Sequence, residues 1–188
     1  VSSAASDVYK RQVQHAQNTL NQTFQIDTFA QFDEPWAVVV LPDQRLLITE
    51  RKGQLKLLDP KTKKNLNVQG IPTVSYGGQG GLGDVVLHPD FKNNHWIYLS
   101  YAVQGSGGYG AEISRAKLDL SNPEQPKLTD LKRIWQQVPK VSGQGHYAHR
   151  MLFGADGKLW VSSGERQKFD PAQDMKSNLG KILRLNED

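Results

Sequence analysis

The stretch MLFGADGKLWVSS, residues 151–163, contains the pattern that decides the fold of this chain. An apolar run, residues 151–153, leads into a turn with Asp156 and Gly157, and a second run, residues 159–163, ends in two serines. An Asp-Gly pair between two apolar runs is typical of a β-hairpin, because both residues tolerate a positive φ angle. The stretch therefore predicts two antiparallel strands joined by a tight turn.

The same unit occurs twice more towards the N-terminus, around Asp90 and Asp43. In each copy an apolar strand meets an aspartate-containing turn, a second strand ends in Thr or Ser, and a closing strand follows after a loop. The strands predicted in this way cover residues 37–41, 46–50, 54–58, 85–87, 96–101, 111–118, 151–153, 159–163 and 181–185. The shorter interval between the aspartates is close to the roughly 40–50 residues of a propeller blade.

These repeats predict an all-β chain whose antiparallel four-stranded sheets stack radially as a β-propeller. The main structural alternative is a β-sandwich, which is also built from short alternating strands at regular turn spacing. Radial stacking is favoured because the Gly-rich and polar loops follow equivalent strands, so they would gather at one end of a channel. Helices are not expected after residue 22.

The N-terminal residues differ from the rest of the chain. Residues 1–12, VSSAASDVYKRQ, have no apolar period, and the stretch that follows is rich in Gln and Asn. We expect residues 1–23 to be a foreign or disordered lead-in and residues 24–188 to be the propeller domain. β structure is expected from Phe24 onward, because Phe24, Ile26 and Phe29 suggest the alternation of a strand.

Composition and charge exclude several classes of protein. The chain has 188 residues, 37% of them hydrophobic and 22% charged, as expected for one globular core. The net charge of +4 is dispersed, and its densest cluster, Lys61, Lys63 and Lys64, falls in a predicted hairpin loop, so nucleic acid is not an expected partner. No cysteine is present, which excludes thiolate metal sites, and no apolar run approaches the roughly 18 residues of a membrane span.

Residues 75–84, SYGGQGGLGD, form the first loop with candidate chemistry. The glycines allow the backbone to approach a ligand closely, but the loop lacks the Gly-Lys-Ser/Thr ending of a phosphate-binding loop and runs into a strand. Gln79 is the one long polar side chain within the glycine run, and its amide can donate and accept hydrogen bonds to a polyhydroxylated substrate. The alternative is a tight turn whose glutamine is merely solvated.

The second loop, residues 144–150, brings His146, His149 and Arg150 to the entrance of an apolar strand. A histidine held there is a candidate general base, because its ordinary pKa lies near neutrality. The alternative is an ordinary polar residue at a strand end. The two histidines do not form a convincing metal site, since positions i and i+3 of a strand face opposite ways and no third ligand is near in sequence.

Four further side chains that can carry a charge have plainer interpretations. His88 and His95 flank residues 89–94, which are interpreted as a hairpin, so both histidines are expected to be structural. Glu165 and Arg166 end a predicted strand on the same side as the His146 loop. Either could reach the channel, although a surface ion pair is the more ordinary outcome.

Six motifs follow one another along the chain: Gln79-Gly80-Gly81-Leu82, HPDFKNN at 88–94, His146-x-x-x-Arg150, Gly164-Glu165-Arg166, Ala172-Gln173-Asp174 and LGKILRLN at 179–186. Together they resemble the soluble PQQ-dependent aldose sugar and glucose dehydrogenases. The resemblance covers residues 35–188. It implies a six-bladed β-propeller, of which this chain is roughly the N-terminal half, with pyrroloquinoline quinone (PQQ) and calcium in the central cleft.

The resemblance also implies roles for two residues. His146, four residues before Arg150, would be the general base on the C1 hydroxyl of an aldose while hydride passes to the quinone. Gln79 would contact the cofactor or the sugar. Two positions depart from the family pattern: Gly145 stands where the glucose enzymes have an acid, and Gly83 stands where the second leucine of Gln-x-Gly-Leu-Leu is usual.

The same resemblance sets expectations for the whole protein. No metal ligand is expected within this chain, because the calcium ligands and the remaining PQQ ligands are expected beyond residue 188. The 188-residue chain is therefore expected to be inactive alone and to self-associate through apolar sheet faces. A periplasmic or secreted location is implied, with an aldose as substrate and an electron acceptor that the sequence does not identify.

A second function of another class remains open at this point. A non-catalytic β-propeller could bind carbohydrate or a protein partner through the same channel mouth. His146 and Gln79 together favour the sugar dehydrogenase, because a binding module has no need of a base at a hydride-transfer centre.

Overall fold

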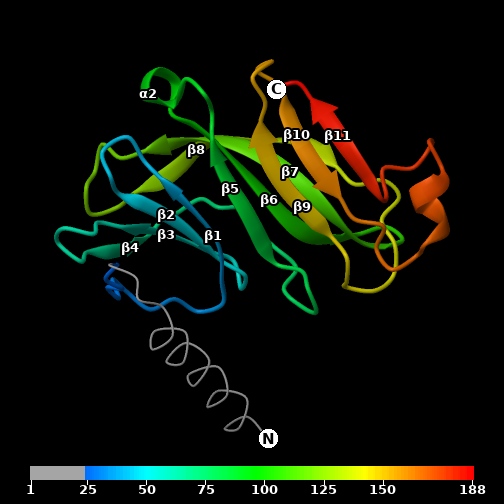
Figure 1. Cartoon of the computed structure of the whole chain (residues 1–188), viewed down its shortest axis with the longest axis horizontal. Helices are drawn as coiled ribbons and strands as arrows, with labels where there is room; N and C mark the ends of the chain where they lie inside the picture. The colour runs from blue at the N-terminus through cyan, green and yellow to red at the C-terminus, as the bar shows by residue number, and fades with distance from the viewer. Residues whose placement is uncertain (1–23) are drawn as a thin grey trace, which may run out of the picture.

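The computed structural model describes residues 24–188 and contains eleven strands in three antiparallel sheets (Figure 1). In the first two sheets each strand pairs with the one that follows it in the chain, and β9 and β11 flank β10 in the third. Sheet 1 contains β1 (Pro35–Val40), β2 (Leu46–Glu50), β3 (Gln54–Leu58) and β4 (Asn65–Asn67). Sheet 2 contains β5 (Leu82–Leu87), β6 (Trp96–Gly105), β7 (Gly108–Asp119) and β8 (Lys127–Gln136), and sheet 3 contains β9 (Ala148–Phe153), β10 (Leu159–Ser163) and β11 (Lys181–Leu185).

The three predicted turn aspartates occupy equivalent places. Asp43 lies between β1 and β2, Asp90 between β5 and β6, and Asp156 between β9 and β10, which are the first and second strands of the three sheets. The carboxylates of Asp43 and Asp156 each accept a hydrogen bond from the backbone N–H two residues later, at 3.0 and 3.1 Å. Such a bond stabilises a tight turn locally, so one side chain type recurs where the same turn recurs.

The first strand of each sheet is bulged at its start. The register slips between Pro35 and Ala37, between Leu82 and Val85, and between the partners of Val161 and Ser163 in β9. A bulge removes backbone groups from the regular ladder, and these groups need other partners. The partners are found on the second strand of each sheet. The hydroxyl oxygens of Thr49, Ser100 and Ser162 accept hydrogen bonds from the N–H groups of Ala37, Asp84 and Arg150, respectively.

Sheet 2 is packed on both faces, which positions the other two sheets. Leu99 of β6 belongs to a buried cluster that contains Leu47 and Leu55 of sheet 1. Its neighbour Tyr98 points the other way and belongs to a cluster with Met151 and Val161 of sheet 3. Because sheet 2 packs against sheet 1 on one face and against sheet 3 on the other, the sheets form a stack of three layers and not a two-sheet sandwich. Burying one such side chain stabilises this packing by roughly 1.5–3 kcal/mol.

One strand from each sheet lies in the middle of this arrangement. β5 contacts β1 on one side and β9 on the other, so the three first strands lie next to one another (Figure 1). The loops that precede these strands therefore meet at one end of the stack, and the aspartate turns meet at the other. No helix within residues 24–188 has the length and apolarity that crossing a membrane requires.

The structure corrects several details of the prediction. Residues 24–32 form no strand, and Phe24, Ile26 and Phe29 are all more than half exposed, because no neighbouring strand pairs with this segment. Two short helices, α2 (Phe91–Asn94) and η1 (Asp170–Gln173), occur where none was expected. β4 and β8 were missed, since β4 has three residues and β8 is a largely exposed, polar strand. The predicted lead-in, residues 1–23, lies outside the described residues.

Candidate functional site

The predicted residues Gln79 and His146 are brought together at the loop end of the sheets. Gln79 lies between β4 and β5, and His146 lies between β8 and β9. The side-chain oxygen of Gln79 accepts a hydrogen bond of 2.7 Å from the backbone N–H of His146. The backbone N–H of Gln79 in turn donates to the carbonyl oxygen of Gln144, at 2.8 Å. The Gly-rich loop and the histidine loop are therefore joined directly, and Gln79 is more than a solvated turn residue.

Glu165 completes the surroundings of His146 from a third loop. It follows β10, and its carboxylate forms a hydrogen bond with Nδ1 of His146. The backbone N–H groups of Phe169 and Lys168 donate to its other oxygen at 2.9 and 2.8 Å. The backbone bond from Phe169, followed by the bond with His146, lowers the pKa of Glu165 to about 2. Glu165 is therefore ionised at neutral pH.

The charge of Glu165 fixes the tautomer of His146. An ionised carboxylate can only accept a hydrogen bond, so Nδ1 must carry the proton in this contact. In the neutral ring Nε2 then carries the lone pair, and it is the nitrogen able to take a proton. The His146 side chain is 49% exposed, so a ligand can reach Nε2 from the loop end of the sheets.

Gly145, beside His146, leaves room for another side chain. A Cβ atom on residue 145 would lie 2.6 Å from the side-chain oxygen of Gln167. The Gln167 amide thus fills the space that a side chain of residue 145 would take, and Gln167 is exposed. An amide next to His146 is uncharged, whereas an acid at position 145 would place a carboxyl group there.

His149 has quite different surroundings, although it lies only three residues after His146. It is 2% exposed, its ring stacks on Trp36 at 5.4 Å, and its Nδ1 is 2.7 Å from the hydroxyl of Ser100. Burial, with smaller contributions from the charges of Arg150 and Arg166, lowers its pKa to about 4. His149 is thus a neutral side chain between the sheets and is not accessible to a substrate.

The departure at Gly83 is explained by His149. A Cβ atom on residue 83 would lie 2.0 Å from Cε1 of the His149 ring. Trp36, Gly83 and His149 each lie seven residues before the turn aspartate of their own sheet. The same repeat position therefore carries an indole ring in sheet 1, no side chain in sheet 2 and an imidazole ring in sheet 3. The imidazole ring lies between the first strands, in the space that a side chain at residue 83 would need.

Arg150 links the same three sheets. Its guanidinium lies 3.3 Å from the buried carboxylate of Asp84 in sheet 2 and 4.4 Å from the ring centre of Trp36 in sheet 1. The other carboxylate oxygen of Asp84 accepts the backbone N–H of Met151 at 2.8 Å. Burial raises the pKa of Asp84 from its ordinary value, against the opposing effects of these donors.

The expected surface ion pair at Glu165 and Arg166 is not formed. Glu165 binds His146 instead, and Arg166 is only 1% exposed, with its guanidinium against the carbonyl oxygens of Gly143, Gly145 and Tyr109. Sequence reasoning missed this because arginine is rarely buried. The available signal was position, since the two charged residues directly follow the strand next to the His146 loop.

Comparisons with known proteins identify the family of this chain. A family model described as "Glucose / Sorbosone dehydrogenase" matches residues 32–188. The chain belongs to the glucose/sorbosone dehydrogenase family. It is 38% identical over 159 residues to an aldose sugar dehydrogenase of Escherichia coli, covering 82% of this chain and 42% of that protein. It is 27% identical over 180 residues to quinoprotein glucose dehydrogenase B of Acinetobacter calcoaceticus, covering 83% and 37%.

Solved structures of the glucose/sorbosone dehydrogenase family match the fold. A PQQ-bound aldose sugar dehydrogenase of Streptomyces coelicolor superposes with a TM-score of 0.76 at 30% identity, covering 86% of this chain and 47% of that one. A glucose dehydrogenase superposes with a TM-score of 0.77 at 34% identity, covering 82% and 45%. The three sheets are thus blades of a β-propeller, as predicted, and the chain spans less than half the length of these relatives.

His88 and His95, the other two histidines among residues 24–188, make the structural contacts that were expected. Nδ1 of His88 accepts the backbone N–H of Asp90 at 3.0 Å, and Nε2 lies 2.7 Å from the carboxylate of Glu187. His95 ends α2 in a left-handed conformation with φ of 58°. Within residues 24–188 no group of three His, Asp or Glu side chains is arranged to hold a metal ion.

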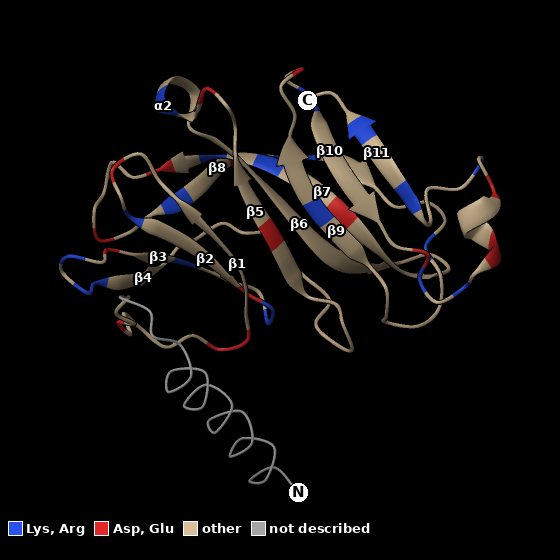
Figure 2. Cartoon of the chain, viewed as in Figure 1, with Lys and Arg blue, Asp and Glu red and all other residues tan. Residues whose placement is uncertain are grey.

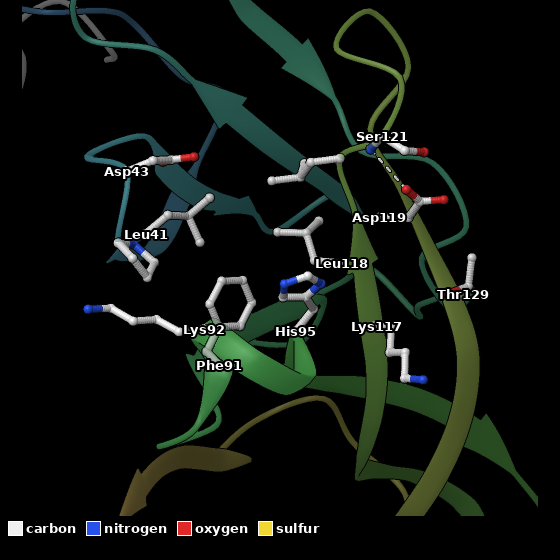
Figure 3. Close-up of a pocket in the computed structure, with 12 residues that line it drawn as sticks. Leu41, Asp43, Phe91, Lys92, His95, Lys117, Leu118, Asp119, Ser121 and Thr129 are labelled. Carbon is white, nitrogen blue, oxygen red and sulfur yellow. Dashed lines mark hydrogen bonds between the residues drawn. The ribbon is translucent and has the colours of Figure 1, made fainter.

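A separate cleft of about 620 Å³ lies at the turn end, and His146 is not among the residues that line it (Figure 3). Phe91 and His95 of the α2 region face Leu41 and Leu118 across it. Asp119, at its rim, accepts the backbone N–H of Ser121 and so is engaged in a turn. Charged residues of both signs are interspersed over the three sheets and their loops (Figure 2). The cleft thus shares no lining residue with the site formed by Gln79, His146 and Glu165.

Proposed function

We propose that the protein is a PQQ-dependent aldose sugar dehydrogenase in which His146 removes the proton from the C1 hydroxyl of the sugar. The observation that carries the proposal is the contact between Nδ1 of His146 and the ionised carboxylate of Glu165. This contact leaves Nε2 as the proton acceptor at an exposed loop end, where a sugar hydroxyl can reach it.

Glu165 and Gln79 support His146 in different ways. When Nε2 takes the hydroxyl proton the ring becomes positive, and the adjacent carboxylate of Glu165 stabilises that charge. The Gln79 oxygen holds the backbone N–H of His146, which fixes the loop, while its NH₂ group can donate to the cofactor or to a sugar hydroxyl. General-base assistance of this kind is typically worth about 10²–10⁴ in rate.

The residues present fit an anionic quinone in their chemistry. The ammonium of Lys168 donates to the hydroxyl of Ser142, at 3.1 Å, and so lies on the loops that carry Glu165 and His146. An ammonium group and a glutamine amide are suitable donors to carboxylates and quinone oxygens. When bound, PQQ supplies the group that accepts hydride from C1. We infer that calcium would be held by residues beyond residue 188, and that the protein acts in the periplasm or outside the cell.

The second candidate function is a non-catalytic propeller. It is favoured by one comparison, since the chain is also 26% identical over 161 residues to human Hedgehog-interacting protein, covering 77% of this chain and 23% of that protein. Against it, a binding module has no use for a histidine whose tautomer is fixed for proton transfer. Residues 144–150 and Glu165 therefore favour the enzyme.

The test is dye-linked oxidation of aldoses with added PQQ and calcium. Residues 1–188 should be assayed beside a chain extended to the length of the relatives, because this chain spans 42% of the E. coli relative. We expect sugar oxidation by the extended chain and none by residues 1–188 alone. Carbohydrate or protein binding without PQQ binding or sugar oxidation in the extended chain would instead support the binding module.

A further inference from the structure

Arg166 is a buried cation whose contacts all lie around the His146 loop. Its side chain is 1% exposed, and its three hydrogen bonds go to backbone carbonyl oxygens and not to a carboxylate. Burying a charge without an opposite charge costs several kcal/mol unless its donors are satisfied. Because burying Arg166 is costly, we expect its side chain to have a specific role in the fold or in the site.

The guanidinium of Arg166 contacts every second residue of the segment that carries His146. Nη2 donates to the carbonyl oxygen of Gly143 at 2.7 Å, and Nε donates to that of Gly145 at 2.8 Å. The guanidinium also lies over the ring of Tyr147, 3.7 Å from its centre. Nη1 donates to the carbonyl oxygen of Tyr109 in β7, at 2.5 Å, so the loop is tied to sheet 2 as well. The planar fork of arginine can hold several acceptors at once, which the single ammonium of lysine cannot reproduce.

The backbone of this segment needs such support. His146, Ala148 and His149 have φ angles of 48°, 59° and 52°, in the left-handed region that non-glycine residues rarely adopt. Each such residue costs of the order of 1–3 kcal/mol and persists only where its surroundings hold it. The N–H of Arg166 itself donates to the carbonyl oxygen of His146 at 3.3 Å, and that of Gly164 donates to Tyr147 at 3.0 Å.

We propose that Arg166 is the positioning residue for His146: its guanidinium holds residues 143–147, with His146 in its left-handed conformation, and so sets the imidazole against Glu165. Because Glu165 and Arg166 are adjacent, one short segment holds both the ring and the backbone of the histidine loop. The catalytic consequence rests on the proposed function, whereas the positioning itself does not.

The experiment measures amide hydrogen exchange in Arg166→Lys, with Arg184→Lys as the matched control. Arg184 is an exposed arginine of sheet 3 whose guanidinium binds Asp156 at the turn end. In Arg166→Lys we expect the amides of His146 and Gly164 to exchange at least about tenfold faster, while the amides of β6 keep their rates. Arg184→Lys should change neither set.

A second variant covers the case in which lysine is not tolerated. Arg166→Gln removes the buried charge and with it the cost of desolvation. Its amide can donate to one carbonyl oxygen but cannot replace the several N–H donors of the guanidinium. This variant should fold and show the same local loss of protection. Equal acceleration of the His146 and β6 amides, unchanged exchange at His146, or failure of both variants to fold would each show that Arg166 serves only general stability.

Sugar oxidation by the extended chain gives a separate readout. In Arg166→Lys we expect kcat to fall by about 10- to 100-fold with little change in KM, because the base is misplaced while the sugar contacts remain. A wild-type chain that oxidises no sugar would refute the proposed function, but the exchange result would still decide the role of Arg166. Unchanged kcat in an active chain would refute the catalytic consequence alone.

Discussion

His146 and His149 are three residues apart and belong to opposite environments. His146 is half exposed, contacts a carboxylate and lies where three loops meet, whereas His149 is buried, stacks on Trp36 and contacts a hydroxyl. The imidazole of His146 is open to a ligand at the loop end, whereas the ring of His149 is enclosed between the first strands. The comparison shows that the surroundings, and not the residue type, separate a chemical site from a structural one.

Replacing each histidine with alanine should have opposite effects, and this is the largest difference we expect. His146→Ala should lower the turnover of aldose by about 10²–10⁴, because the proton acceptor is lost. Its free energy of unfolding should change by less than about 0.5 kcal/mol, since the side chain is exposed. His149→Ala should cost about 2–4 kcal/mol of stability, because the ring leaves a cavity, and its turnover should change much less.

The measurements are steady-state sugar oxidation by the extended chain at saturating PQQ and urea unfolding of the same proteins. PQQ binding, followed separately, controls for loss of cofactor. If His149→Ala lost turnover while His146→Ala kept it, the assignment of the base would be wrong.

The surroundings of His149 and those of His146, which include Glu165, should also affect the free energy of unfolding in different pH ranges. The pKa of His149 is lowered from 6.5 to about 4, so the unfolded chain binds a proton more readily than the folded one. Stability is therefore lost as the pH falls from about 6.5 to about 4, by at most about 3 kcal/mol. Glu165, whose pKa is lowered to about 2, contributes stability that is lost only below its ordinary pKa.

Urea unfolding between pH 7 and pH 4 tests this assignment. His149→Ala should flatten the curve between pH 6.5 and pH 4, whereas Glu165→Gln should leave that interval almost unchanged. A curve that stays equally steep in His149→Ala would mean that another group is responsible.

Adding one methyl group near each histidine gives a smaller contrast. In Gly83→Ala the new Cβ would lie 2.0 Å from the buried ring of His149, and we expect a cost of about 1–3 kcal/mol from overpacking. The double variant Gly83→Ala/His149→Ala should recover much of this cost, because the ring that collides is gone. Additive losses in urea unfolding would show that the two positions are not coupled.

The same methyl group beside His146 should have the smallest effect. In Gly145→Ala the three atoms nearest to the new Cβ all belong to the far end of the exposed Gln167 side chain, which can turn away. The free energy of unfolding should change by less than about 0.5 kcal/mol. A loss as large as that of Gly83→Ala would mean that the loop end is as tightly packed as the region between the strands.

The repeats in the sequence were sufficient to predict the architecture. The strands at residues 46–50, 54–58 and 159–163 were predicted residue for residue, since most of their apolar residues are buried. The strand at residues 181–185 was also predicted residue for residue, although Ile182 is 70% exposed. The Thr or Ser at the end of each second strand was recognised as part of the repeat, but its use at the bulge could not be predicted. Edge strand β8 was missed because it is polar and has little burial pattern.

The site was predicted only in part, because its contacts span long stretches of sequence. The resemblance identified Gln79 and His146, which are 67 residues apart and hydrogen-bonded. Glu165 was a candidate for the channel, but its bond to His146 is a property of the fold. Arg166, like Glu165, was expected either to reach the channel or to form a surface ion pair, and only the three-dimensional arrangement shows that the carbonyl oxygens of Gly143 and Gly145 converge on it.

The repeat position seven residues before each turn aspartate carries a different residue in each blade, and this difference restricts which blades can be exchanged. Trp36, Gly83 and His149 occupy equivalent places in three blades, and the ring of His149 fits against Trp36 because residue 83 has no side chain. Exchanging or duplicating a single blade would change which of these residues meet. The space that the His149 ring now fills would then contain either two rings or none. We therefore expect recombination between relatives to succeed where it keeps all three first strands from one parent.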